Sequence, residues 1–231
     1  MVSIITVTMR PQYMDEVLFN YARQEWEDKE LIVVLNKDNM NLNKWKERAK
    51  LFDRVRVYQL PEEYPLGRCL NWAIARANSK IIAKFDDDDY YAPYYLSESM
   101  KAIQSGKAPI IGKHTAYVYF VKKRALMLYR KGNENRHKKK LKGGTIVFKR
   151  TVWDRVKFDE KKVAGSDARW LTECADAGYK AYSVSKENYA CIRRGDGNSH
   201  TQKRRTKDYM KHCNKICQTG NYVPYVTKKV K

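Results

Sequence analysis

The chain has 231 residues, of which 43% are hydrophobic, with 47 Lys and Arg against 26 Asp and Glu, a net charge of +21. This length and hydrophobic content are typical of a globular protein with a sizeable core and exclude an intrinsically disordered chain. The sequence contains no run of 18 apolar residues and does not begin like a signal peptide, so we expect a cytoplasmic protein without a transmembrane segment. Five scattered cysteines favour reduced thiols over a disulfide framework.

The charge is divided unevenly along the chain. Residues 1–100 carry 14 Lys and Arg against 16 Asp and Glu, whereas residues 101–231 carry 33 against 10, which gives net charges of −2 and +23. The basic residues of the second half concentrate between 122 and 142 and between 193 and 215. This asymmetry indicates that the second half meets a polyanion, although a solvated basic face is the simpler alternative.

The first hundred residues alternate between strand and helix patterns. Apolar, β-branched or alternating runs predict strands at 2–8, 30–36, 54–60 and 80–85. Apolar residues at helical spacing predict helices after Pro11, at 41–52 and at 66–78. Repeated strand–helix units predict an α/β fold with a mostly parallel sheet and right-handed crossovers.

The pattern changes after residue 105. Short strands are predicted at 109–112, 115–121, 124–130, 144–148, near 180–184 and at 188–193, with one helix from 166 to about 177. The sequence shows no internal repeat and no flexible linker between the two halves. We therefore expect a single domain over residues 1–231, whose second half is basic and more irregular.

Four consecutive aspartates follow the fourth predicted strand, in the stretch AKFDDDDYYAP at 83–93. Each neighbouring pair of carboxylates at about 5 Å costs roughly 1–3 kcal/mol at a surface-like dielectric constant. In open parallel sheets, ligands bind beyond the carboxyl ends of the strands, where Thr8 and Asn36 are also expected. These aspartates therefore indicate a site that holds a cation, with a solvated acidic turn as the alternative.

Two longer stretches surround this site. The first is VSIITVTMRPQYMDEVLFNYARQEW followed by ELIVVLN, and the second is PLGRCLNWAIARANSKIIAKFDDDDYYAPYYL, which contains a D-x-D-D-x-x-x-P-x-x-L pattern that begins at Asp86. Both stretches resemble family 2 glycosyltransferases with the GT-A fold. The match covers residues 2–100 and resumes at GGTIVFKR, FDE, GSDARW and NSHT. The resemblance implies a nucleotide-sugar-binding half at 1–100 and an acceptor-binding half at 101–231.

The resemblance also implies a divalent metal ion, Mn²⁺ or Mg²⁺, that neutralises the leaving diphosphate. Asp88 would be its direct carboxylate ligand, and His200 in NSHT would complete the coordination. Asp86 would bind the ribose or reach the ion through water, with Asp87 beside it in the donor site. Alternatively, Asp87 and Asp89 cap the following turn or brace the site.

Further donor contacts are implied at the ends of the first strands. Thr8 and Arg10 lie where the family's first strand meets the nucleotide. Asn36 stands where many relatives have an aspartate that accepts the uracil N3–H; an asparagine can accept the same bond, so UDP is favoured and the base stays open. Arg68 would contact the base or the diphosphate, or else is an exposed helical arginine.

The transfer step of an inverting enzyme needs a carboxylate that accepts the proton of the acceptor hydroxyl. Asp167 matches the second residue of the family's acidic catalytic motif, and Ser166 replaces the acidic residue often found before it. An aspartate that opens a helix can also act only as a cap. Asp159 and Glu160 are the alternative bases.

The basic second half implies a polyanionic acceptor, contacted by Lys138, Lys139, Lys140, Arg204 and Arg205. Two acceptors fit: a hydroxymethylated DNA base, or a polysaccharide of a bacterial envelope or spore surface. A base within DNA would have to be turned out of the stack to react. A hypothesis of another class is a non-catalytic nucleic-acid-binding protein on a degenerate GT-A scaffold.

Overall fold

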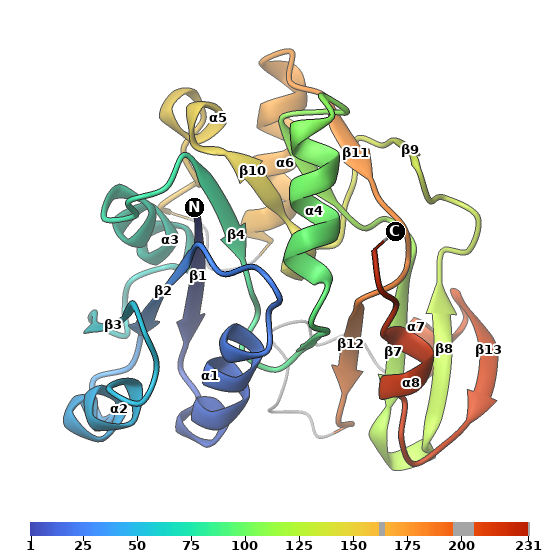
Figure 1. Cartoon of the computed structure of the whole chain (residues 1–231), viewed down its shortest axis with the longest axis horizontal. Coiled ribbons are helices and arrows are strands. Elements are labelled where there is room, and N and C mark those ends of the chain that lie inside the picture. Colours follow the sequence, from blue (N-terminus) through green and yellow to red (C-terminus); the bar gives the residue numbers. More distant parts are fainter. Residues whose placement is uncertain (162–164, 196–205, 231) are drawn as a thin grey trace.

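The structure is a computed structural model that describes residues 1–161, 165–195 and 206–230, and it contains two β-sheets (Figure 1). The larger sheet has eight strands in the order β3-β2-β1-β4-β10-β6-β11-β9. Its strands are β1 (Val2–Thr8), β2 (Lys29–Leu35), β3 (Val55–Gln59), β4 (Ile81–Lys84), β6 (Ile110–Gly112), β9 (Arg136–His137), β10 (Val147–Lys149) and β11 (Ala181–Ser183). The smaller sheet has the order β13-β8-β7-β12-β5. Its strands are β5 (Tyr90–Tyr91), β7 (Ala116–Phe120), β8 (Ala125–Tyr129), β12 (Tyr189–Arg193) and β13 (Cys213–Gln218).

Strands β1 to β4 form a parallel core in the larger sheet, because β1 pairs in parallel with both β2 and β4, and β2 with β3. Strands β9 and β10 run antiparallel to their neighbours. Side chains of consecutive strand residues point to opposite faces, so Ile4 and Ile5 enter different hydrophobic clusters. Both faces are therefore buried, and the predicted α/β sheet flanked by helices is confirmed.

Helices cover both faces of this sheet. Helices α1 (Met14–Ala22), α2 (Leu42–Ala49) and α4 (Tyr95–Gln104) pack in one hydrophobic cluster. Helices α3 (Leu66–Ala75), α5 (Arg150–Arg155) and α6 (Ser166–Asp176) pack in the other. In Figure 1, α4 stands in front of the centre of the sheet and α6 lies behind it. This arrangement brings the start of α6 to the carboxyl end of β4.

The smaller sheet lies beside the larger one in Figure 1, and β5 joins it directly after the aspartates. Strand β5 pairs with β12, which runs parallel to β7, and β7 and β8 form a hairpin whose outer neighbour is β13. Helix α8 (Val223–Val226) packs on this sheet through Val226, and helix α7 (Thr206–Met210) precedes β13. The four aspartates therefore connect the two sheets.

One predicted strand begins later than expected. The first two residues of the predicted strand 144–148 belong to a 3₁₀ turn, Gly143–Thr145, and β10 starts at Val147. The turn is fixed by two tyrosines, because the Tyr91 hydroxyl donates to the carbonyl of Gly144 (2.5 Å) and that of Tyr95 to the carbonyl of Thr145 (2.8 Å). Within the described ranges, none of the helices has the length and apolar character needed to cross a membrane.

Candidate functional site

The four aspartates fold into a tight turn at the carboxyl end of β4. The rings of Phe85 and Tyr91, which flank the turn, stack with their centroids 3.7 Å apart. The main-chain N–H of Asp86 donates to the Tyr91 hydroxyl oxygen (2.7 Å). This packing holds the turn closed, so all four carboxyl groups lie in the same small region. With Asp167, which lies close by, they are called the carboxylate cluster below.

Arg10 follows β1 and binds two members of the cluster. Its Nε donates to Asp87 (3.0 Å), a second guanidinium nitrogen also contacts Asp87, and a third lies 3.1 Å from Oδ2 of Asp88. Thr8 donates its hydroxyl to Asp87 (2.5 Å). Burial alone would lower the pKa of Arg10, but the bonds and charges of both carboxylates raise it. The structure thus brings these four predicted site residues together.

A buried lysine connects the cluster to α6. Nζ of Lys84 lies 2.5 Å from Oδ1 of Asp86 and 3.2 Å from Oδ2 of Asp167. Burial raises the pKa of Asp167, and the nearby charge of Lys84 opposes this rise. Asp167 is also the acidic residue in the first turn of α6, where its charge favours the helix. Both interpretations of Asp167, base and helix-stabilising residue, are compatible with this position.

Two consecutive glycines lie against the same carboxylates. A Cβ atom on Gly143 would overlap the carboxylate of Asp167, and one on Gly144 would lie 2.6 Å from Oδ2 of Asp86 and 3.1 Å from Oδ2 of Asp89. No side chain fits at either position without displacing a carboxylate. The glycine pair GG of GGTIVF therefore lets the main chain approach the cluster closely, a role that the sequence analysis did not assign to it.

Asp89 lies among the other carboxylates and also connects them to the smaller sheet. Its carboxylate accepts hydrogen bonds from the Tyr189 hydroxyl and from the main-chain N–H of Ile192 (3.1 Å), both on β12. Burial raises the pKa of Asp89 to about 7, with the charge of Asp88 adding to the shift. The main-chain carbonyl of Asp89 accepts a bond from the amide of Asn20 on α1 (2.8 Å).

Two predicted donor residues lie outside these contacts. Asn36 follows β2 and is buried, and its side-chain NH₂ donates to the carbonyl of Pro61 (2.7 Å), while an amide oxygen can in addition accept a hydrogen bond. Arg68 is exposed on the first turn of α3, and its guanidinium stacks on Tyr64, 3.6 Å from the ring centroid. Stacked and exposed, Arg68 has a planar surface available to a ligand.

The predicted acceptor residues fall into two groups. Lys138, Lys139 and Lys140 follow β9, and the latter two are exposed. The chain runs from them through Lys142 into the glycine pair, so they lie a few residues from the carboxylate cluster. His200, Arg204 and Arg205 lie outside the described residues, and their predicted roles stay predictions.

The carboxylate cluster fits one mode of divalent metal binding. Within the ranges that the structure describes, three His, Cys, Asp or Glu side chains nowhere come together as a metal site. Mg²⁺, however, usually binds through one or two carboxylates together with substrate phosphates and water. Asp88 supplies a hard oxygen ligand of this kind, so the residues fit an ion that arrives with a diphosphate rather than an ion bound by protein alone.

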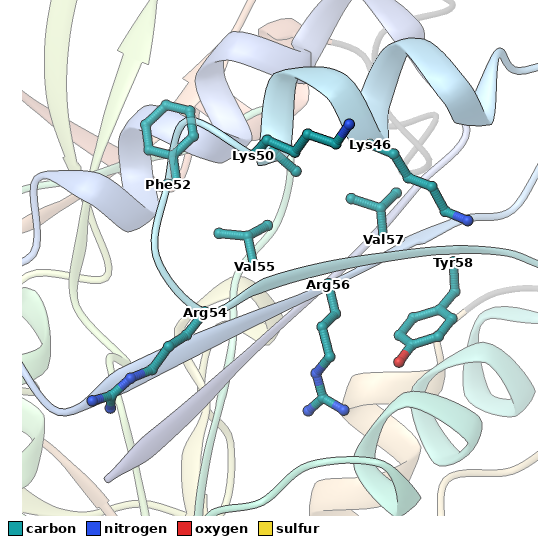
Figure 2. Close-up of a pocket in the computed structure, with 9 residues that line it drawn as sticks. Lys46, Lys50, Phe52, Arg54, Val55, Arg56, Val57 and Tyr58 are labelled. Carbon is teal, nitrogen blue, oxygen red and sulfur yellow. The ribbon is translucent and has the colours of Figure 1, made fainter.

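A separate groove of about 400 Å³ lies at the β3 edge of the larger sheet, between α2 and β3 (Figure 2). It contains four cationic side chains, from Lys46, Lys50, Arg54 and Arg56. Strand β3 is at the edge of the sheet. The N–H of Leu31 donates to the carbonyl of Arg54 (3.0 Å) and the N–H of Leu60 donates to the carbonyl of Leu35 (2.9 Å), so the main-chain groups of even-numbered residues in β3 point toward β2. The main-chain groups of Val55, Val57 and Gln59 therefore face outward.

Comparison with known proteins shows what the chain is similar to. A family model described as Glycosyl transferase family 2 matches residues 3–158. The O-antigen biosynthesis glycosyltransferase WbnJ of Escherichia coli is 30% identical over 115 residues, which make up 48% of this chain and 45% of that protein. This chain thus spans less than half the length of its curated relative.

Two solved structures have a similar fold. TarS 1–349 of S. aureus in complex with UDP-GlcNAc matches with a TM-score of 0.68 at 16% identity, covering 87% of this chain and 61% of that chain. The mannosyltransferase PcManGT from Pyrobaculum calidifontis, in complex with GDP-Man and Mn²⁺, matches with a TM-score of 0.66 at 17% identity, covering 86% and 58%. These likenesses confirm the predicted fold, and this chain spans about three fifths of each structure.

Proposed function

This chain belongs to glycosyl transferase family 2, as its sequence predicted, and we propose that it transfers a sugar from a nucleotide sugar to an acceptor hydroxyl. The observation that supports this most is the carboxylate cluster at the end of β4, where the buried Lys84 pairs with Asp86 and with the candidate base Asp167. We propose further that the transfer inverts the anomeric carbon and depends on a divalent metal ion. Each of these points rests on the residues around the cluster.

The donor would bind across the carboxyl ends of β1, β2 and β4. The side chain of Asp86 is more exposed than that of Asp88, 35% against 10%, so Asp86 would accept hydrogen bonds from a ribose. Asn36 would offer its Oδ1 to the base, and Arg10, which pairs with Asp87 and Asp88, would lie near the diphosphate. UDP is the favoured nucleotide, in keeping with the UDP-GlcNAc complex of TarS, whereas PcManGT carries GDP-Man.

Asp88, with His200 as a predicted second ligand, would hold Mn²⁺ or Mg²⁺ between the chain and the diphosphate. When bound, the ion supplies Lewis-acid stabilisation of the negative charge on the departing diphosphate. Arg10 already neutralises Asp87 and part of Asp88. Asp87 would therefore hold Arg10 in position beside Asp88 and would not contact the donor itself.

Asp167 would act as the base. In an inverting transfer, the acceptor oxygen attacks the anomeric carbon on the face opposite the diphosphate and passes its proton to a carboxylate. Lys84 pairs with both Asp167 and Asp86, so one side chain links the candidate base to the carboxylate that would bind the donor. Among the described residues, Oδ1 of Asp167 is buried and has no hydrogen-bond partner, which leaves its lone pairs free.

The acceptor would lie against the basic second half of the chain. The curated relative is named for O-antigen biosynthesis, so we place an anionic polysaccharide of a bacterial envelope ahead of DNA. Lys138, Lys139 and Lys140, of which the latter two are exposed, keep nucleic acid as the second candidate, because phosphate-rich chains bind such clusters through charge alone. A cluster that joins a candidate metal ligand, Asp88, to a candidate base, Asp167, disfavours a purely non-catalytic binding protein.

The test is donor turnover by the purified chain. A panel of UDP-, GDP- and other nucleotide sugars is incubated with Mn²⁺, first alone and then with candidate acceptors, and the products are identified by mass spectrometry. We expect slow hydrolysis of one nucleotide sugar without acceptor and a mass increase of one sugar on the correct acceptor. Absence of turnover across the whole panel would contradict the proposed function.

A further inference from the structure

The most unusual charged group outside the predicted site residues is Lys84. It is the last residue of β4 and is only 4% exposed, in a strand whose other residues are apolar. Removing an ammonium group from water costs several kcal/mol unless carboxylates and hydrogen bonds compensate. Lys84 has two such partners, Asp86 at 2.5 Å and Asp167 at 3.2 Å, which come from different segments of the chain.

We propose that Lys84 is a positioning residue, which holds the base Asp167 ionised and at a fixed distance from the donor-binding carboxylate Asp86. The inference rests on the proposed function, because it assigns Lys84 a role in that same reaction. Lys84 is not itself a catalytic residue, since its ammonium group is occupied by the two carboxylates and is shielded from solvent.

The geometry leaves Asp167 few other restraints. Within the described residues, Lys84 is the one cation that forms an ion pair with it, through Oδ2, while Oδ1 has no partner. The main chain at Gly143 also lies against this carboxylate. Without Lys84, Asp167 would keep its place at the start of α6 but would lose the bond that sets the rotation of its carboxyl group.

The charge of Lys84 also controls the protonation of Asp167. Burial raises the pKa of Asp167 and the charge of Asp86 raises it further, whereas Lys84 and, more weakly, Lys142 lower it. A carboxyl group can accept a proton only when it is ionised. Without Lys84, burial and the charge of Asp86 would raise the pKa of Asp167 further, so a larger share of Asp167 would be protonated near neutral pH.

The alternative is that Lys84 only stabilises the fold, and the chain offers a matched control for this. Lys113 is also a fully buried lysine, paired with Glu98 at 2.7 Å and bonded to the carbonyl of Ser185. It makes no ion pair with a member of the carboxylate cluster among the described residues. A buried lysine that acts on stability alone should behave like Lys113.

The experiment measures donor turnover from pH 5 to pH 9 for the wild type and for Lys84→Met, Lys84→Arg and Lys113→Met, with stability followed by thermal unfolding. We expect Lys84→Met to lower kcat on the order of 10²-fold through misplacement of the base. The acid limb of its pH profile should move to higher pH, and Lys84→Arg should restore most of both. Lys113→Met should lose stability but keep the wild-type kcat and acid limb.

A double variant tests whether Lys84 acts through Asp167. Lys84→Met should cause no further loss of kcat in an Asp167→Asn background, because residues that act as a unit are not additive. The inference would be overturned if the losses of kcat from the two substitutions multiply in the double variant, or if the acid limb of Lys84→Met does not move. If the wild type turns over no donor, the proposed function fails separately. In that case the pKa of Asp167 is measured by ¹³C NMR titration. We expect a higher pKa in Lys84→Met than in the wild type, and an equal pKa in the two proteins would overturn the inference.

Discussion

The main chain of Gly144 lies so close to Asp86 that a Cβ atom at this position would stand 2.6 Å from the carboxylate oxygen Oδ2. The carbonyl of the same glycine accepts the Tyr91 hydroxyl, and that hydroxyl oxygen accepts the N–H of Asp86. Gly144 and Asp86 are thus joined twice, once by direct contact and once through Tyr91. Neither partner can shift without moving the other.

Gly144→Ala should therefore displace Asp86 and reduce donor binding. The added methyl group overpacks a tight contact, which typically costs about 1–3 kcal/mol of stability. We expect a raised KM for the nucleotide sugar, measured by steady-state kinetics, beside the loss of stability. Gly106→Ala is the control: it also costs stability, because Gly106 has a φ of +73°, but nothing lies near its Cβ, so KM should stay unchanged. An unaltered KM in Gly144→Ala would contradict the prediction.

Asp88→Asn should abolish transfer while the fold survives. The amide keeps the shape of the carboxylate but loses the charge that would hold a divalent ion, so the affinity for the nucleotide in Mn²⁺ should fall. Isothermal titration with UDP, with and without Mn²⁺, measures this directly. Full activity of this variant, or undiminished wild-type activity in excess EDTA, would remove the metal from the proposal.

Asp167→Asn should separate chemistry from binding. Only the proton acceptor is lost, so turnover should fall by about 10²–10⁴-fold while the affinities for donor and metal change little. Kinetics and calorimetry on the same preparation provide both values. If the folded fraction keeps its specific activity, Asp167 serves only the helix, and Asp159 and Glu160 become the residues to test.

Replacing Lys138, Lys139 and Lys140 with alanine should weaken the salt dependence of polyanion binding. Each phosphate contact on duplex DNA contributes a slope of about −0.9 to log affinity against log salt, so losing three contacts should flatten it by about 2–3. Fluorescence anisotropy between 50 and 200 mM salt, with a labelled DNA duplex and with labelled heparin, measures this.

The matched control for this experiment is Lys46→Ala with Lys50→Ala, on the near-neutral first half, which should leave the slope unchanged. If the wild type binds heparin but not DNA at 50 mM salt, nucleic acid is excluded as the acceptor. If it binds neither, the polyanionic acceptor is contradicted altogether.

Glu30 should contribute stability that disappears in acid. Burial alone would raise its pKa, but hydrogen bonds from Ser3, from the N–H of Asn78 and from Arg56 outweigh burial and lower it. Because the folded-state pKa lies below that of the unfolded chain, this stability is present above pH 4.5 and lost as the pH falls through the folded-state value. Glu30→Gln should cost about 1–3 kcal/mol at pH 7.

Urea unfolding of the wild type and Glu30→Gln at pH 7, 5 and 3.5 measures this difference. The two proteins should converge in stability as the pH decreases. A difference that stays constant over this range would show that Glu30 contributes through its shape and not through its charge.

The part of the fold that carries the aspartates could be predicted from the sequence, because buried parallel strands carry continuous apolar runs. The runs at 2–8 and 80–85 correspond to β1 and β4, and their pairing brings Thr8 and Arg10 to Asp87 and Asp88. Periodicity therefore predicted the strands and helices, and the rule that ligands bind at the carboxyl ends of strands predicted where the candidate site lies.

The contacts that complete the cluster could not be predicted, because they join segments far apart in the chain. Lys84 was visible as a charge inside the apolar run IIAKF, which signals a buried partner, but nothing local identified that partner as Asp167. Strands β5 and β13 owe their state to pairing with β12 and β8 and not to their own patterns. The donation from Asn36 to Pro61 is likewise a tertiary contact.

Strand β3 has a consequence for how copies of this chain behave together. Its outward main-chain groups could accept another strand, and a bare edge of this kind is a common route to aggregation. The cations of the adjoining groove flank that edge, and of these Arg54 and Arg56 pair with Asp28 and Glu30. A second β3 approaching the edge would bring the groove lysines, Lys46 and Lys50, near their counterparts, and this repulsion between like charges opposes edge-to-edge association.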